Sequence, residues 1–296
     1  MTTAIRMVRR FPQDATVWGM HQSSALDFLA DHHPCVLIDV TEAKGSTPRD
    51  AGTFMLVAMD AIWGTIGGGQ LEYMAIDNAR ALLAGSGLAE MNIPLGPEIG
   101  QCCGGRTRLS FSALTPQLAE NLRYRLEVEK SALPHITLFG AGHVGQALVQ
   151  ALSPLPFMVS VVESRAEELR SLPAGTTTRL TALPEAEVEK MAPGSAVLIL
   201  THDHALDFLI ARIALARSDL AYVGMIGSAT KRATFAHWLE REGEDRALLQ
   251  RLVLPIGGSV VKDKRPEVIA ALVAAELLTV YAVRQDKRSE RQVLHP

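Results

Sequence analysis

The chain has 296 residues, of which 48% are hydrophobic and 21% are charged. A chain of this length can form two ordinary domains, and we expect two. The formal net charge of −3 gives no general attraction to nucleic acid or to an anionic membrane. We expect no membrane span, because no run of about 18 uncharged apolar residues occurs. The basic N-terminus lacks the apolar stretch of a signal peptide.

Cysteine usage limits the possible classes further. The sequence has three cysteines, one alone and two adjacent, which do not make a disulfide framework. It contains no CxxC pair, no HExxH and no GxxxxGK[ST]. These absences argue against a zinc module, a zinc protease and a P-loop NTPase. We therefore expect a reducing, cytoplasmic location.

The first third of the chain predicts short strands joined by polar or glycine-rich loops. Apolar, β-branched runs of four to six residues indicate the strands, and a 3.6-residue period indicates the helices. The expected strands are 35–40, 53–58, 62–66 and 107–111, and the expected helices are 23–30 and 71–83.

A helical stripe separates the two expected domains. Leu118, Leu122 and Leu126 recur every four residues among charged side chains, which is typical of a solvated helix. We therefore place an N-terminal domain at 1–114, a linker helix at 115–134, a second domain at 135–283 and a loose polar tail at 284–296.

The second domain alternates strands and helices, which predicts a parallel sheet covered on both faces. The fold class is therefore α/β, with a C-terminal Rossmann-like doubly wound sheet and a smaller N-terminal α/β (α+β) domain. The strands are expected near 136, 159, 196, 221 and 252, and the helices near 146, 185, 205, 229 and 267.

A dinucleotide-binding fingerprint opens this second domain. An apolar strand runs into Gly140, Gly142 and Gly145, a helix follows, and a second strand ends at the acidic Glu163. The glycines would allow a tight turn, the approach of a pyrophosphate and close helix packing, while Glu163 could bind a ribose diol. His143 lies inside the turn and faces the same crevice. The turn can also survive as scaffold without a ligand.

Another glycine cluster, Gly67-Gly68-Gly69-Gln70, precedes the helix expected over 71–83. Successive backbone N–H groups and a helix N-terminus could hold a phosphate or another oxyanion. A structural turn that needs positive φ explains the same residues and is slightly favoured.

The preceding loop concentrates Ser46, Thr47 and Arg49, which could hold an anionic ligand. An ordinary exposed polar turn is the alternative, and it is favoured for the loop taken alone.

Cys102 and Cys103 are flanked by glycines on both sides, and Arg106 would favour a thiolate. Soft thiolates suit a soft metal or sulfur transfer, so both cysteines are candidate contacts to a metal or to sulfur. Buried, inert cysteines are the alternative. Cys35, alone in an apolar strand, is expected in the core.

His202-Asp203-His204 follows an expected strand, at the edge where open α/β sheets bind ligands. Two histidines and an acid could bind a metal or shuttle protons, and all three are candidate cofactor contacts. Helix capping by Asp203 is the favoured interpretation. Ser228, Lys231 and Arg232 lie on a similar loop and could contact phosphate or cap a helix.

These loops together resemble the XdhC/CoxI family, the accessory proteins of molybdenum hydroxylases such as xanthine dehydrogenase. The resemblance runs from about residue 24 to 283. Its motifs, in order, are EAKGSTPRDAG (42–52), GTIGGGQLE (64–72), GQCCGG (100–105), FGAGHVG (139–145), THDHALD (201–207) and YVGMIGSATKR (222–232).

The resemblance implies a chaperone that binds molybdenum cofactor (molybdopterin), protects it while a cysteine desulfurase supplies its sulfur, and passes it to the apo-hydroxylase. A homodimer is the usual assembly. The chain departs from the family at 252–259, where LVLPIGGS lacks the histidine before the PIG turn and the acidic residue after it. The role of that histidine therefore does not transfer.

Two other classes stay open. An NAD(P)-dependent oxidoreductase would use the Rossmann turn with His143, His202 or His204 as general acid. A redox- or nucleotide-sensing module would use Cys102 and Cys103 as its sensor. Hydride transfer would favour the first class, and thiol-dependent partner exchange without molybdenum the second.

Overall fold

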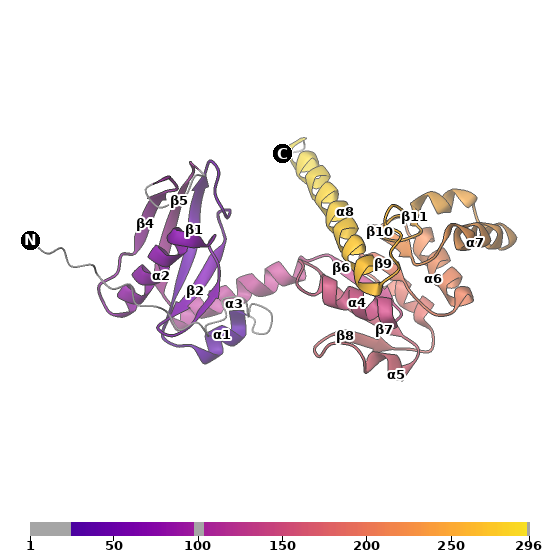
Figure 1. The fold of residues 1–296 in the computed structure, drawn as a ribbon, viewed down its shortest axis with the longest axis horizontal. Coiled ribbons are helices and arrows are strands. Elements are labelled where there is room, and N and C mark those ends of the chain that lie inside the picture. The colour runs from indigo at the N-terminus through magenta and orange to yellow at the C-terminus, as the bar shows by residue number, and fades with distance from the viewer. Residues whose placement is uncertain (1–24, 98–103, 295–296) are drawn as a thin grey trace, which may run out of the picture. The chain divides into compact units, whose positions relative to one another are not determined.

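A computed structural model describes residues 25–97 and 104–294, the latter from residue 285 on by its backbone alone. The chain divides into two compact units, Met1–Val128 and Glu129–Pro296, and each is described by itself (Figure 1). The boundary falls within helix α3 (Pro116–Ser131). Residues Cys102 and Cys103 lie outside the described part.

The first unit contains a five-stranded antiparallel sheet with the order β3-β2-β1-β5-β4. Strand β4 falls in a stretch whose mixed composition gave no clear prediction. The elements are α1 (Ala25–Asp31), β1 (Cys35–Lys44), β2 (Phe54–Ala58), β3 (Ile62–Gly64), α2 (Gly69–Leu83), β4 (Glu90–Pro94) and β5 (Arg106–Ala113).

Both faces of this sheet are covered, because alternate residues of β1 enter two different cores. Val36 and Ile38 face helix α2, whose Leu71 and Ala75 are fully buried. Cys35 and its neighbours on the other face pack against α1 and α3 (Figure 1). The expected core position of Cys35 is confirmed, since only 1% of it is exposed.

The second unit is built on a six-stranded parallel sheet with the order β11-β10-β9-β6-β7-β8. The first strand, β6, lies between β7 and β9, so the chain winds away from it in both directions. The predicted doubly wound α/β fold is therefore confirmed. The strands are β6 (His135–Phe139), β7 (Met158–Glu163), β8 (Thr177–Leu180), β9 (Ala196–Ile199), β10 (Tyr222–Met225) and β11 (Leu252–Val253).

Helices cover both faces of this sheet, as the alternation predicted. One face packs against α4 and α8, and the other against α6 and α7. The segment near 185 forms a 3-10 helix, η2, and not an α-helix. The bounds are α4 (His143–Leu152), α5 (Ala166–Leu169), η2 (Pro184–Lys190), α6 (His204–Ala216), α7 (Ala229–Arg241), η3 (Arg246–Arg251) and α8 (Pro266–Leu294).

Helix α8 differs from the prediction in two ways. It continues to Leu294, through the segment that was expected to be a loose tail. Its part Pro266–Arg284 is also long and apolar enough to cross a membrane by length and composition, although 28% of that stretch is buried in this unit. Glu276 interrupts it and accepts hydrogen bonds from Tyr222 Oη and from the Gly257 N–H, both at 2.9 Å. These bonds fix α8 to the sheet and to the loop after β11.

Candidate functional site

The glycine turn after β6 has the close packing that its sequence predicted. Gly140 has φ 120°, and a Cβ there would lie 2.6 Å from the carbonyl oxygen of Leu200, at the end of β9. A Cβ on Gly145 would lie 2.3 Å from the carbonyl oxygen of Gly140. Gly142 caps α4 with open space around it, and His143 is exposed. The turn therefore lies directly against the loop that follows β9.

Glu163 is not available to a ribose diol, and this prediction needs correction. Its side chain is 4% exposed, and both carboxylate oxygens already accept hydrogen bonds from the chain. One oxygen accepts the Ala141 N–H at 3.0 Å, and the other accepts the N–H groups of Ser164 and Arg165 at 2.8 and 3.1 Å. The guanidinium of Arg165 bonds to both oxygens at 3.3 Å. Glu163 therefore stabilises the glycine turn through its hydrogen bond from Ala141.

The electrostatics of Glu163 agree with this role. Burial alone would raise the pKa of the carboxyl group, but hydrogen bonds from Ala141, Arg165 and Ser164 outweigh it and hold the pKa below its ordinary value. The carboxylate therefore stays ionised and bonded at neutral pH.

The THDH loop after β9 forms a helix cap. Asp203 Oδ1 accepts the Ala205 N–H at 2.8 Å and so caps α6. His202 and His204 are exposed on either side. Among the described residues, no group of three or more histidine, cysteine or acidic side chains could hold a metal ion. The geometry agrees with the capping interpretation.

A buried ion pair beside this loop was missed by the sequence analysis. The Lys231 ammonium contacts the carboxylate of Asp207, and their side chains are 9% and 0% exposed. Asp207 also accepts the backbone N–H and the hydroxyl of Thr201, at 3.1 and 2.6 Å, while Lys231 donates to the Ile226 carbonyl oxygen at 3.0 Å. The pair thus joins the loops that follow β9 and β10. Both residues belong to motifs singled out above, but nothing in either motif indicated that they meet.

The loop after β10 is otherwise structural. Ser228 caps α7 by accepting the Lys231 N–H at 3.4 Å. Arg232 donates to the carbonyl oxygens of Leu252 and Leu249, at 3.0 and 2.9 Å. A phosphate contact by Ser228, Lys231 or Arg232 would compete with these bonds.

In the first unit, three of the motif loops meet. Ser46 forms an isolated parallel bridge with Gly104, the first described residue after the cysteine pair. A Cβ on Gly105 would lie 2.2 Å from the Ser46 carbonyl oxygen, and a Cβ on Gly67 would lie 2.4 Å from Cγ of Pro48. Loop 42–52 is therefore packed between the glycine cluster and the end of the cysteine loop.

The glycine cluster is already bonded to a carboxylate of the chain. Gly67, Gly68 and Gly69 all have positive φ. Glu72, in the first turn of α2, accepts the N–H groups of Ile66 and Gly68 at 3.1 Å each. The predicted anion site therefore has suitable N–H groups, but the carboxylate of Glu72 already accepts those of Ile66 and Gly68. Gly69 and Gln70 begin the helix, and their N–H groups have no acceptor within it.

Most polar side chains of loop 42–52 are open to solvent. Ser46 and Arg49 are exposed and Thr47 is half-buried. Arg49 passes near Gly67, with its Cγ 3.8 Å from the position of a Cβ there. Lys44 pairs with Glu42, and this contact holds the pKa of Glu42 below its ordinary value.

Comparison with known families assigns both units. The model of the XdhC and CoxI family matches residues 28–91, and that of the XdhC Rossmann domain matches residues 136–277. The chain belongs to the XdhC and CoxI family.

XdhC-type relatives include proteins of different length. "Uncharacterized protein YqeB" of Escherichia coli (strain K12) is 28% identical over 258 residues, which are 83% of this chain and 43% of that protein. The chain therefore spans less than half the length of this relative. A crystal structure described as a xanthine dehydrogenase from Bacillus halodurans has a TM-score of 0.73 and 19% identity, over 88% of this chain and 95% of that one. This likeness shows the shared fold.

Proposed function

We propose that this protein binds molybdenum cofactor, holds it during sulfuration, and delivers it to apo xanthine dehydrogenase or a related molybdenum hydroxylase. The observation that carries the proposal is the meeting of three motif loops in the first unit. The bridge between Ser46 and Gly104 and the contact between Pro48 and Gly67 bring hydroxyls, cations and free helix N–H groups to one place. Family membership supports the same role.

The residues present suit an anionic pterin with a phosphate tail. Gly68 and Gly104 have open space where a Cβ would be, so a ligand could approach the backbone there. Arg49 and Ser46 are exposed beside them and could bond to phosphate. The inner N–H groups are used by Glu72, so the outer N–H groups of Gly69 and Gln70 would take part. When bound, the cofactor would supply the molybdenum and its sulfur ligand.

The proposal extends to sulfur and to partners. Cys102 and Cys103 are the proposed contacts to molybdenum or to the incoming sulfur, on the strength of their sequence context alone. A cysteine desulfurase would supply the sulfur, and the protein would act as a homodimer in the cytoplasm. In this role it is a chaperone and not an independent metabolic enzyme.

An NAD(P)-dependent oxidoreductase is the second candidate. The strand order of the second unit and its open turn at Gly142 favour a nucleotide there. The saturated carboxylate of Glu163 weighs against a dinucleotide held in the usual way, since the ribose acceptor is engaged within the chain. His143, His202 and His204 are exposed near this turn and could serve as acids.

An anaerobic binding experiment tests the two candidates together. The full chain is incubated with molybdenum cofactor, separately with NADH, and passed through a gel-filtration column. Near-stoichiometric retention of pterin and molybdenum is the expected result. Retention of NADH without retention of pterin would favour the oxidoreductase proposal over the chaperone proposal.

A further inference from the structure

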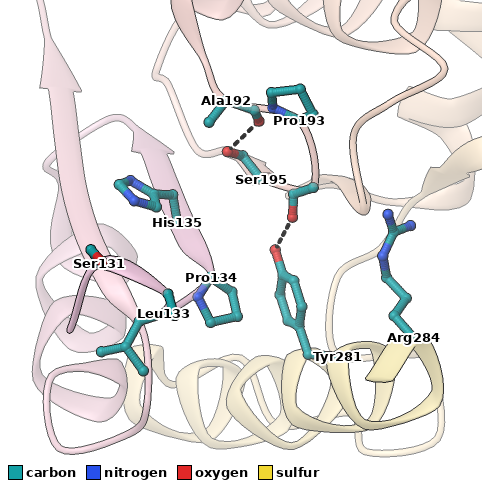
Figure 2. A pocket seen from close by; sticks show the side chains of 11 residues that line it. Ser131, Leu133, Pro134, His135, Ala192, Pro193, Ser195, Tyr281 and Arg284 are labelled. Carbon is teal, nitrogen blue, oxygen red and sulfur yellow. Dashed lines mark hydrogen bonds between the residues drawn. The ribbon is translucent and has the colours of Figure 1, made fainter. Parts of the chain in front are cut away.

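The second unit is hollowed at the edge opposite its glycine turn. Two cavities, of about 250 and 310 Å³, lie at the amino ends of the central strands. The first is bounded by His135 at the start of β6, by Gly194 and Ser195 before β9, and by Tyr281 and Arg284 of α8 (Figure 2). Of the motifs in the sequence analysis, only the first two residues of YVGMIGSATKR, Tyr222 and Val223 of β10, are among the described residues that line the cavities.

The wall of the first cavity is held by hydrogen bonds. Tyr281 Oη donates to the carbonyl oxygen of Gly194 at 2.9 Å, and Ser195 Oγ donates to that of Ala192 at 2.7 Å (Figure 2). Ser195 and Tyr281 are 2% and 9% exposed. Burial raises the pKa of the Tyr281 hydroxyl, so it remains a donor. The loop before β9 and helix α8 are therefore fixed relative to each other without any ligand.

The charged side chains that line the cavities, among the described residues, are arginines. Arg284 lines both cavities, Arg251 lines the second, and the imidazole of His135 lines the first. No aspartate or glutamate whose side chain the structure describes lines either cavity. Arg251 is engaged with the carbonyl oxygens of Leu215 and Arg217, both at 2.7 Å. The lining is thus positively charged with little to balance it.

Arg284 has no counter-charge within the described part of the chain. It is half-buried, and it makes no hydrogen bond or ion pair with any described residue. Asp219, which lies between the lining residues Ser218 and Leu220 in the sequence, is held by Arg217 through bonds of 2.7 and 3.0 Å. A half-buried guanidinium without a partner loses hydration and gains nothing in return. An anion in the cavity would supply both the charge and the acceptors.

We propose that these cavities form a binding site for a small phosphate-bearing ligand, with Arg284 as its main contact. The planar fork of arginine matches phosphate oxygens, and the His135 ring and the Ser218 hydroxyl add donors from either side. The site is independent of the proposed cofactor chemistry, because its lining includes none of the proposed cofactor contacts of the first unit.

Isothermal titration of the full chain with inorganic phosphate and with pyrophosphate, at constant ionic strength, tests the site. The wild-type protein should show saturable binding of at least one. Arg284→Met keeps the aliphatic stem but removes the fork, and should weaken that binding about tenfold or more. Arg241→Met, an exposed arginine of α7, is the matched control and should bind as the wild type does.

Two results would overturn the proposal. One is a titration with no more heat than an equal ionic strength of sodium chloride produces. The other is equal affinity of the Arg284→Met and Arg241→Met variants. If Arg284→Met does not unfold cooperatively, Arg284→Lys replaces it, since it keeps the charge and loses the fork. Wild-type affinity in Arg284→Lys would then count against the proposal.

Discussion

Glu163 accepts the backbone N–H of Ala141 over 3.0 Å, so the acid that ends β7 is tied to the glycine turn that follows β6. In the usual dinucleotide site this carboxylate faces the ribose. Here its second oxygen is also engaged, by Ser164 and Arg165. The acid of the dinucleotide-binding fingerprint therefore stabilises the glycine turn through hydrogen bonds within the chain.

We expect Glu163→Gln to lower the free energy of unfolding by about 1.5–3 kcal/mol at neutral pH, because charged hydrogen bonds are lost in a buried position. Chemical denaturation measures this. Glu168→Gln is the control, since Glu168 pairs with Arg165 from a more exposed position. Equal losses of unfolding free energy in the two variants would contradict a stabilising role for Glu163.

The same residue should give a pH dependence of known sign. Its pKa in the folded state is depressed, so its stabilising effect is present above the unfolded value of about 4.3 and is lost as the pH falls through the folded value. The stability difference between wild type and Glu163→Gln should therefore be constant near pH 7. It should shrink below about pH 4.3. A difference that grows on acidification would refute this assignment.

Lys231→Met removes the cation that pairs with the fully buried carboxylate of Asp207. Removing one partner of a buried pair costs about 3–5 kcal/mol, whereas an exposed pair is worth less than about 1 kcal/mol. Arg246→Met breaks the exposed pair with Glu240 and is the control. Urea titrations of both variants should differ accordingly, and adding Asp207→Asn to Lys231→Met should recover part of the loss.

Gly67→Ala should destabilise more than Gly68→Ala. Gly68 has φ 74° and ψ −177°, a region that only glycine adopts readily, so a Cβ costs about 1–3 kcal/mol although the space is open. At Gly67 the added Cβ would also meet Pro48 at 2.4 Å. Gly96→Ala, without positive φ or a close neighbour, should be silent. A lower denaturation midpoint for Gly68→Ala than for Gly67→Ala would show that loop 42–52 can move to accommodate a Cβ at Gly67.

Gly68→Val tests the cofactor proposal at the same turn. The larger side chain would fill the open space above the backbone and should weaken cofactor retention. Retention is measured by gel filtration, as for the wild type. Unchanged retention in the folded variant would show that the turn is purely structural.

Replacing both Cys102 and Cys103 with alanine should markedly lower delivery of active cofactor and leave the fold intact. Activation of an apo-hydroxylase in the presence of a cysteine desulfurase measures delivery. Cys35→Ala is the control, since Cys35 is a core residue and should affect stability alone. Wild-type activation by the double variant would show that neither Cys102 nor Cys103 is needed for delivery of the cofactor.

The sequence predicted most of the second unit because its signals are local. Apolar, β-branched runs of β6, β7 and β9 and the spacing of Gly140, Gly142 and Gly145 each depend on near neighbours. Strand β8 was missed because all four of its residues are exposed, so it carries no apolar pattern. The exposed edge of a sheet leaves little trace in a sequence.

The partners of charged side chains were harder to predict. Asp207 and Lys231 are 24 residues apart and meet only because β9 and β10 are adjacent. The fate of Glu163 depends on a turn 22 residues earlier. Glu72 is the exception, since an acid in the first turn of a helix commonly binds the N–H groups before it, and that signal was present in the sequence.

The bond between Glu72 and Gly68 has a consequence for any anion that reaches the inner N–H groups of the first unit. Such an anion would have to displace the carboxylate of Glu72, which already accepts these N–H groups. The expelled Glu72 stays tethered within a few ångströms, ready to return. Release of the bound anion is then assisted by a competing carboxylate of the same chain, which fits the proposed delivery of a cofactor.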